Sequence, residues 1–529
     1  MDASERGLQV AGRPALDARV ESGLRWSAAR QTLTGVIGVV GVLAYSRVLQ
    51  PADLGAVGLA FLVYDGLFLL VQAPVRDAVV YYQEQEGDHA SAAFWLLLGF
   101  SGAVVAPAMA LAGQFARFYQ SPFAAGLTRA MMITFLLQSV AVVPAALLLK
   151  RFQFAVHESL QTAYFLLLFA GWVSLALAGF GPWSLVIPSI IASAFWSLTT
   201  WRAVGFRPAL RPTRRAFGDI LRFSRSLFGS KFLVYLKAKM DNAAVGTLGE
   251  DRLGWYSFGE DQSAFATIGL GAVVAQVALP ALAAARDRLE EFRRIYLEML
   301  RLTATLSTPM QIGAFVLADL GIVVIFGEQW LAAVPVFHAY LGFRLVNTLL
   351  EITDAASSAI GRPDIRLAVD AAQLPFFVAG TWFGLTVWGG IAGVAWSLAI
   401  VRAVAGLAYF AVMMRVTGLK IGETLRYLLP NALAGALMGI GVQVARGMEV
   451  LRGMIAPMRQ PFLADALNLI VLTLIGAAGY FAILFALDRA GSVAVARMAW
   501  EIVVPKSLRR WIAGRRKLPR PSAPSGSAW

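Results

Sequence analysis

Long apolar stretches separated by short polar turns constrain this chain more than any other feature of its sequence. A transmembrane helix needs about 20 mostly apolar residues, and we count about fourteen such stretches. They lie at roughly 24–46, 55–76, 92–114, 123–149, 156–178, 182–203, 224–247, 255–281, 296–318, 332–358, 365–388, 390–414, 428–449 and 463–488. Only 15% of the 529 residues are charged, whereas soluble proteins have about 25%. Open strands are excluded in lipid because each unpaired backbone group costs several kcal/mol, so we expect an all-α integral membrane protein.

The distribution of lysine and arginine predicts how the chain is oriented. If the N-terminus is inside, the inner segments hold about 33 of the 46 basic residues and the outer loops hold about 6. An even number of helices then places both termini in the cytoplasm. This asymmetry accounts for most of the net charge of +14, so we expect no nucleic-acid partner. The basic tail "KSLRRWIAGRRKLPR" is expected to lie against anionic lipid headgroups.

The sequence lacks the residues that a metal site or an ATP-binding loop would require. Cysteine is absent and the three histidines are far apart in the sequence, so we expect no metal site. The chain also has no G-x-x-x-x-G-K-[ST] motif, which predicts that it does not bind ATP through a phosphate-binding loop. We therefore expect no cofactor.

One polar turn occurs twice. The stretch "SRVLQPADLG" follows the first expected helix, and "GTLGEDRLGW" follows the seventh. Each contains leucine, four residues and then leucine-glycine, ending at Gly55 and Gly254. Because six helices separate the copies and six is even, they share one orientation, which predicts a parallel repeat of the kind found in transporters. The expected parts are a cytoplasmic segment 1–23, a first six-helix bundle 24–203, a basic cytoplasmic linker 204–223, a second six-helix bundle 224–414, helices 13 and 14 in 428–488, and a basic cytoplasmic tail 489–529.

Five segments in this order carry a resemblance to a known family: "SRVLQPADLGAVGLA", "KMDNAAVGTLGEDRLGWYSFGE", "ALPALAAARD", "VIFGEQWLAAV" and "SAIGRPDIRL". Together they resemble the oligosaccharide and polysaccharide flippases of the multidrug/oligosaccharidyl-lipid/polysaccharide exporter superfamily. The resemblance covers residues 22–415 and, by count, the last two helices. The chain departs from the family pattern at Ser46, where alanine is usual.

The resemblance implies a transporter of the bacterial cytoplasmic (inner) membrane that is not an enzyme. Such a flippase would move an undecaprenyl-diphosphate-linked oligosaccharide repeat unit from the cytoplasmic to the outer leaflet by alternating access. Its product would serve surface polysaccharide export as O-antigen, exopolysaccharide or capsule. A polysaccharide polymerase and glycosyltransferases would be its partners, and a proton or sodium gradient would drive it.

Charged residues inside the apolar stretches are the candidate site residues, because a charge at mid-bilayer costs a few kcal/mol unless it faces a cavity or another charge. The stretch 332–358 carries polar residues at steps of three and four, which place them on one helical face: Arg344, Asn347, Glu351, Asp354 and Ser358. We expect a cationic cavity for an anionic substrate, lined by Arg30, Lys237, Arg344 and Arg402. The acids expected to bind a coupling ion or sugar hydroxyls are Asp65, Asp241, Glu351 and Asp354.

Structural roles compete with these assignments. Lys237 and Asp241 are four residues apart and can neutralise each other, and Arg344 can pair with Glu351 through Asn347. Arg30 can extend to the membrane surface instead of facing a cavity.

Other functions also stay open. They are a lipid II flippase, a multidrug or cation antiporter of the same superfamily, and an integral-membrane polysaccharide polymerase or ligase. The basic character of the intramembrane residues disfavours a cation antiporter. The longest expected outer loop, 446–462, has one acidic residue and no histidine, which disfavours the polymerase or ligase.

Overall fold

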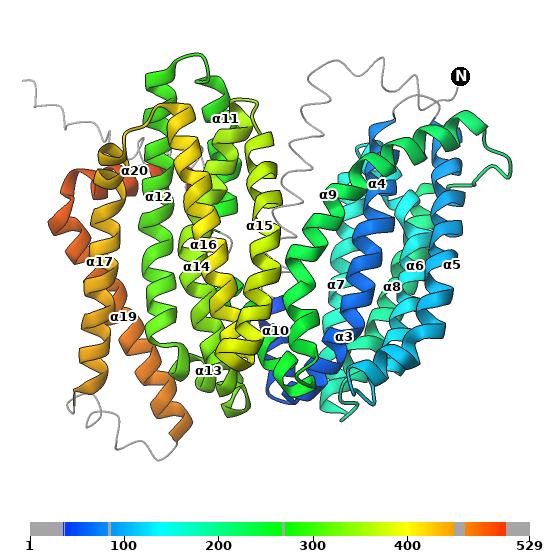
Figure 1. Ribbon diagram of the computed structural model, residues 1–529, viewed down its shortest axis with the longest axis horizontal. Helices are drawn as coiled ribbons and strands as arrows, with labels where there is room; N and C mark the ends of the chain where they lie inside the picture. The colour runs from blue at the N-terminus through cyan, green and yellow to red at the C-terminus, as the bar shows by residue number, and fades with distance from the viewer. Residues whose placement is uncertain (1–34, 36, 83–85, 267–269, 449–460, 504–529) are drawn as a thin grey trace, which may run out of the picture. The chain divides into compact units, whose positions relative to one another are not determined.

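The computed structural model describes residues 35, 37–82, 86–266, 270–448 and 461–503 (Figure 1). All the regular elements in these residues are helices, which confirms the expected all-α class. After the helical segment Ile37–Ser46 they are α3 (Pro51–Leu67), η1 (Phe68–Gln72), α4 (Ala73–Tyr81), α5 (Glu86–Phe118), α6 (Ala124–Lys150), α7 (Phe154–Leu177), α8 (Trp183–Val204), α9 (Arg214–Gly246), α10 (Glu250–Phe265), α11 (Leu270–Ala284), α12 (Leu289–Val316), α13 (Ala318–Phe326), η2 (Glu328–Ala333), α14 (Val334–Ala359), α15 (Asp364–Phe383), η3 (Gly384–Gly389), α16 (Gly390–Thr417), α17 (Ile421–Gly447), α19 (Pro461–Leu487) and α20 (Arg489–Val503).

The number of membrane spans is smaller in the described residues than the sequence predicts. Nine helices are long and apolar enough to cross a membrane, or up to eleven if each of two bent helix pairs forms one span. The helical range Asp364–Thr417 counts once, although it contains both α15 and α16 with a π-helical segment between them. At that junction Gly389 and Gly390 have φ of 75° and 68°, which residues with a side chain rarely adopt. The count of fourteen therefore stays a prediction.

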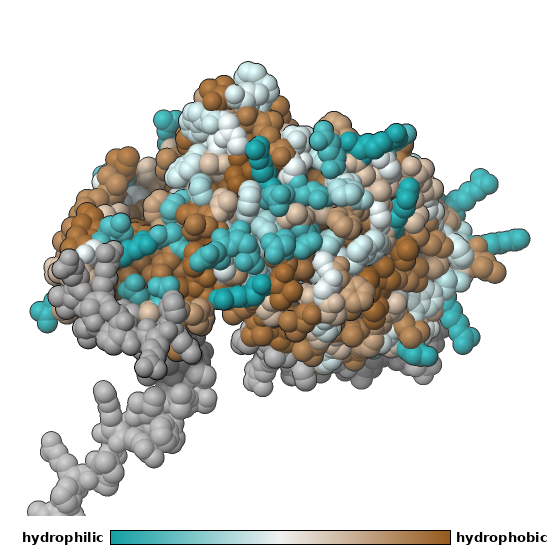
Figure 2. Space-filling view, turned by 90° about the horizontal axis from the view of Figure 1, so that it is seen from below, coloured by the Kyte–Doolittle hydropathy of each residue, from teal (hydrophilic) through white to brown (hydrophobic). Residues whose placement is uncertain are grey.

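Exposed apolar side chains show which surface meets lipid. On α17 they recur at steps of four and three along one face: Ile421, Leu425, Leu429, Leu433, Leu437, Ile440 and Val444. A water-soluble protein rarely exposes such a continuous apolar stripe. Figure 2 shows broad hydrophobic areas of this kind on one face of the molecule. The chain is a multi-pass membrane protein.

The helices divide into two compact units. The described part of unit 1 reaches from residue 35 to Ser263 and adds Ala318–Tyr340 and Asp370–Arg402. In this unit α6 packs against α5 and α8, and α7 packs against α8. Lipid tails are as apolar as leucine, so the hydrophobic effect does not drive helices together inside a membrane. Close packing at small residues stabilises the contact between helices instead. Gly171 of α7 illustrates it, since a Cβ there would lie 2.6 Å from Cβ of Pro188 on α8.

The two similar turns of the sequence meet in unit 1. Gly55 is the fifth residue of α3, and Gly254 is the fifth residue of α10. A Cβ on Gly55 would collide with the carbonyl of Glu250, the first residue of α10, and a Cβ on Gly254 would collide with the carbonyl of Pro51, the first residue of α3. The helices thus cross at two glycines in a reciprocal backbone contact.

A second pair of contacts follows the same reciprocal pattern. The carbonyl oxygen of Ser46 accepts hydrogen bonds from Gln329 Nε2 and Trp330 Nε1, both at 2.8 Å. In return, Ser121 Oγ donates to the carboxylate of Glu250. Each contact joins one of the two similar turns to a loop that is distant in the sequence. We define these contacts, together with the glycine crossing, as the turn clasp.

Arg47 extends the turn clasp to the end of α13. Its Nε donates to the carbonyl of Ile325 at 3.2 Å, and its Nη2 donates to the carbonyl of Val324. These carbonyls belong to the last turn of α13 and have no partner within the helix. A cation at a helix C-terminus is also favoured by the helix dipole.

The described part of unit 2 comprises Ala264–Leu317, Leu341–Val369 and Ala403–Val503, apart from 267–269 and 449–460. In it α17 packs against α12 and α19. Asn431 of α17 joins three helices, since its Oδ1 accepts from Thr305 Oγ1 at 2.9 Å and from Tyr480 OH at 3.1 Å. Arg301 of α12 forms an ion pair with Asp488, directly before α20.

Candidate functional site

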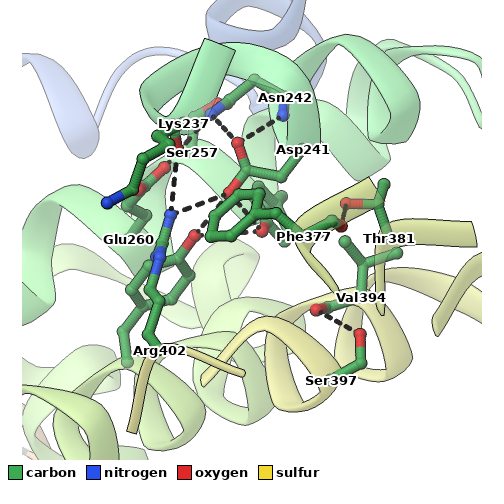
Figure 3. A network of polar contacts seen from close by, with 12 residues as sticks. Lys237, Asp241, Asn242, Ser257, Glu260, Phe377, Thr381, Val394, Ser397 and Arg402 are labelled. Atoms are coloured by element: carbon green, nitrogen blue, oxygen red, sulfur yellow. Dashed lines mark hydrogen bonds and ion pairs between the residues drawn. The ribbon is translucent and has the colours of Figure 1, made fainter. Parts of the chain in front are cut away.

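A buried polar network lies in unit 1 around the C-terminal half of α9 (Figure 3). This helix begins at Arg214, where Thr213 Oγ1 accepts the backbone N–H of Ala216 at 3.2 Å. It continues to Gly246 as one helix. Its regular turn places Lys237 and Asp241 one above the other, at a spacing of four residues.

Asp241 is at the centre of the network and is fully buried. Its Oδ1 accepts the backbone N–H of Asn242 at 3.0 Å. Its Oδ2 accepts from Tyr340 OH at 2.9 Å and from Tyr256 OH at 3.0 Å. A buried charge is tolerated when hydrogen-bond donors and an opposite charge surround it, and this carboxylate has both.

Arg402 supplies the opposite charge. Its guanidinium lies 3.4 Å from Asp241 Oδ2, and the side chains are 13% and 0% exposed. The guanidinium carbon also lies 5.1 Å from the ring centroid of Tyr340 and 4.9 Å from that of Phe377. Arginine is weakly hydrated and stacks on aromatic rings, which suits it to such a buried position.

A second carboxylate, Glu260, joins the network through Asn242. The Nδ2 of Asn242 donates to Glu260 Oε2 at 3.2 Å and to Asp241 Oδ1 at 3.4 Å. The Oδ1 of Asn242 accepts from Ser257 Oγ at 2.7 Å. The amide of Asn242 therefore lies between the two carboxylates.

Three lysines of α9 form ion pairs with aspartates from three other helices. Lys237 lies 2.5 Å from Asp370 of α15, Lys239 lies 2.8 Å from Asp65 of α3, and Lys231 lies 3.4 Å from Asp77 of α4. The side chains of these pairs are between 21% and 32% exposed, whereas the Arg402–Asp241 pair is buried. The three lysine pairs are thus more accessible than the Arg402–Asp241 pair at the centre of the network.

The polar stripe of α14 lies in unit 2 and has different partners. The carboxylate of Asp354 lies 3.3 Å from Arg366. Asn347 Nδ2 lies 3.4 Å from Glu351 Oε1, and the other oxygen of Glu351 has no hydrogen-bond partner among the described residues. A Cβ on Gly271 would collide with that second oxygen, so the carboxylate lies against the first turn of α11.

The structure brings together only part of the predicted set. Lys237, Asp241 and Arg402 lie in one network in unit 1, and Asp65 pairs with Lys239 nearby on α9. Three others, Arg344, Glu351 and Asp354, are on α14 in unit 2, and Arg30 lies outside the described residues. Among the described residues no cluster of three histidine or acidic side chains is arranged to hold a metal ion.

Several residues of the network were not among the predicted site residues: Asn242, Tyr256, Ser257, Glu260, Tyr340 and Asp370. Glu260 had a signal in the sequence, because it is an acid within an expected span. The tyrosines had none, since they also fit an apolar core or a membrane interface.

Similar proteins with curated names are involved in making or exporting polysaccharides. The chain is 27% identical over 333 residues to the succinoglycan biosynthesis transport protein ExoT of Rhizobium meliloti, covering 61% of this chain and just under two thirds, 66%, of that protein. It is 24% identical over 329 residues to the teichuronic acid biosynthesis protein TuaB of Bacillus subtilis, covering 61% and 68%. It is 21% identical over 457 residues to the lipopolysaccharide biosynthesis protein WzxC of Escherichia coli, covering 82% and 89%.

Solved structures of transporters share the fold. The lipid II flippase MurJ in an inward closed conformation aligns with a TM-score of 0.70 at 12% identity, covering 88% of this chain and 99% of MurJ. An inward-facing multidrug resistance transporter of the MATE family, in the MOP superfamily, aligns with a TM-score of 0.58 at 14% identity, covering 73% and 94%. At such identities the likeness shows the fold alone.

The family profile described as "Polysaccharide biosynthesis protein" matches residues 42–335, which is more than half of the chain. This match confirms the resemblance that the sequence motifs indicated. The chain belongs to the polysaccharide biosynthesis protein family.

Proposed function

We propose that this protein is a flippase for an undecaprenyl-diphosphate-linked oligosaccharide repeat unit. It moves this lipid from the cytoplasmic to the outer leaflet of the bacterial cytoplasmic membrane by alternating access, and it catalyses no covalent reaction. The observation that carries the proposal is the family match together with polysaccharide-related relatives that align over 61–82% of the chain. The surface polysaccharide that is built from the unit is O-antigen, exopolysaccharide or capsule.

The charges inside the spans support an anionic substrate. A diphosphate cannot cross hydrocarbon unaided, and lysine and arginine are the side chains that bind phosphate oxygens. The lysine–aspartate pairs of α9 are partly exposed, so a diphosphate can replace the aspartate as the partner of Lys237 or Lys239. On α14 we assign the same role to Arg344. Arg402 already has Asp241 as its buried partner, and we assign it to the internal network.

The proposed orientation places both termini in the cytoplasm, as the lysine and arginine distribution indicates. The turn clasp of Gly55 and Gly254 then lies at the outer end of unit 1. We further propose that 24–203 and 224–414 form the two repeats of the transporter. The basic tail contacts anionic headgroups, and a polymerase and glycosyltransferases act before and after the flipping step.

A flipping assay with defined lipids tests the proposal. The purified protein is placed in vesicles with a fluorescent undecaprenyl-diphosphate oligosaccharide, and a membrane-impermeant quencher reports how much lipid has changed leaflet. We expect flipping of this lipid and none of a neutral lipid of equal chain length. Flipping of lipid II but not of other oligosaccharides would redirect the assignment to peptidoglycan, and export of cationic drugs alone would overturn it.

A further inference from the structure

We propose that Glu260 is the group at which this transporter takes up and releases a coupling proton. The inference rests on the proposed transport function and identifies the ion and the residue that couple to it. Its support comes from the way in which the network of unit 1 distributes hydrogen bonds and charges.

The Asp241 carboxylate has no position left for a transported ion. Five donor groups surround its two oxygens: Tyr256 OH, Tyr340 OH, an Arg402 N–H, and the backbone and side-chain N–H groups of Asn242. A carboxylate offers about four lone-pair positions. The oxygens of Asp241 are therefore fully occupied, with Arg402 as the counter-ion, and a metal cation would have to displace the guanidinium.

Glu260 is left without a cation of its own. Its carboxylate accepts one hydrogen bond within the described residues, from the neutral amide of Asn242 at 3.2 Å. The nearest lysines of α9 are committed elsewhere, since Lys237 pairs with Asp370 and Lys239 pairs with Asp65. One guanidinium thus faces two carboxylates of the network.

The charges around Glu260 favour uptake of a positive ion. Asp241 on α9 and Asp261 on α10 repel its negative charge, and Arg402 on α16 and Lys239 on α9 attract it. Within the part of the chain that the structure describes, the hydroxyls of Tyr256 and Tyr340 also face it. Asp241 and Asp261 carry the same negative charge as an ionised Glu260, and repulsion between like charges is strong in a low-dielectric environment. Protonation makes Glu260 neutral and removes this repulsion.

A proton fits this site better than sodium does. A metal cation needs several oxygen ligands at once, but Asn242 Oδ1 already accepts from Ser257 Oγ at 2.7 Å, and the oxygens of Asp241 already accept from the hydroxyls of Tyr256 and Tyr340. A proton needs only the carboxyl oxygen, and it supplies a hydrogen that this oxygen can donate. The structure therefore points to a carboxylic acid that exchanges its proton with water.

The proton at Glu260 also acts on α16 through Arg402. The guanidinium is held by Asp241 and faces Glu260. When Glu260 is protonated, Asp241 is the sole anionic partner in this network. When Glu260 loses the proton, the guanidinium is drawn toward two anions, one on α9 and one on α10. The proton thus changes the electrostatic force between α16 and α10, which couples it to helix movement.

Vesicles with an imposed pH gradient test the inference. Flipping of the fluorescent lipid is measured for the wild type and for Glu260→Gln, which keeps the Asn242 contact but cannot exchange a proton. The matched control is Asp251→Asn, an exposed acid in the first turn of the same helix. We expect the gradient to accelerate the wild type and the control, whereas Glu260→Gln flips at equal rates with and without the gradient.

Two outcomes separate this inference from the proposed function. If Glu260→Gln flips lipid and keeps the wild-type response to the gradient, the inference is wrong and the flippase assignment stands. If the wild type responds to a sodium gradient and not to pH, the inference is also wrong. No flipping by the wild type under any gradient would overturn the proposed function instead.

Infrared difference spectroscopy gives a readout that does not depend on transport. Spectra of the full-length protein at low and high pH are subtracted, and the carbonyl band of protonated carboxylic acids is followed. We expect one component of this band to be missing in Glu260→Gln and present in Asp251→Asn. An unchanged band in Glu260→Gln would exclude this residue as the proton site, even if the variant transports poorly.

Discussion

Gly55 and Gly254 occupy equivalent positions in α3 and α10, and each lies against the first carbonyl of the other's helix. Two hydrogen bonds repeat this exchange: the indole of Trp330 donates to the backbone carbonyl of Ser46, and the hydroxyl of Ser121 donates to the carboxylate of Glu250. The two copies of the Leu-x4-Leu-Gly turn therefore do more than occur twice in the sequence. They are the place where α3 and α10, which are distant in the sequence, contact each other in unit 1.

Alanine at either glycine is expected to destabilise the protein. In Gly55→Ala or Gly254→Ala the new methyl group collides with a backbone carbonyl that cannot rotate away. Overpacking of this kind costs roughly 1–3 kcal/mol of the free energy of unfolding. The measurement is the thermal unfolding midpoint in detergent. Gly58→Ala is the matched control, because its methyl would meet only the Leu253 and Ser257 side chains, at 3.6 Å and beyond.

A cross-link across the turn clasp is expected to stop transport. The natural chain has no cysteine, so Ser121→Cys with Glu250→Cys introduces the only two thiols. These side chains are in contact, and a short bifunctional thiol reagent should join them. If the outer end opens during alternating access, flipping in vesicles should cease after cross-linking and persist in each single-cysteine variant. Full flipping by the cross-linked protein would show that this end stays closed throughout.

Removal of Arg402 is expected to strand a buried charge. Arg402→Ala leaves Asp241 fully buried without its counter-ion, and breaking a buried ion pair typically costs about 3–5 kcal/mol. The double variant with Asp241→Asn should recover most of the lost thermal stability, since the unpaired charge is gone. A double variant that is no more stable than Arg402→Ala would show that the guanidinium stabilises the fold mainly through its aromatic contacts.

Arg344 is expected to contribute to substrate binding. Arg344→Ala should lower flipping roughly tenfold or more at normal protein levels, because one charge-assisted hydrogen bond contributes about 1.5–3 kcal/mol. Arg344→Lys should restore part of it, since the planar two-donor geometry is lost. The measurement is surface polysaccharide in cells, with the protein quantified by blot, and the exposed Arg362→Ala serves as the control. Recovery when Glu351→Ala is added to Arg344→Ala would assign the arginine to folding instead.

The proposed topology is tested by reporter fusions. Fusions after Arg202, Arg286 and Arg415 should report the cytoplasm, and a fusion after Leu253 should report the outer side. The basis is the excess of lysine and arginine in the segments that are expected to be inside. A cytoplasmic signal at Leu253 would contradict the orientation and move the turn clasp to the inner side.

The candidate site was only partly predictable, because its contacts join distant parts of the chain. The four-residue spacing of Lys237 and Asp241 allows them to neutralise each other. In the structure Lys237 instead pairs with Asp370, 133 residues away, and Asp241 with Arg402, 161 residues away. Lys237 and Asp241 both lie in the expected helix 224–247. Their spacing along that helix carries no information about which other helix packs against it.

Local features of the sequence were sufficient to predict the helical class, the membrane location and the family. Apolar stretches of about 20 residues predict spans because the bilayer requires each segment to satisfy its own backbone, and ordered motifs such as "VIFGEQWLAAV" identify relatives. Only the tertiary structure decided the partners of Asp241, Glu260 and the two glycines. The physical reason is that a buried charge or a backbone crossing is stabilised by groups from other helices, and packing alone determines which groups those are.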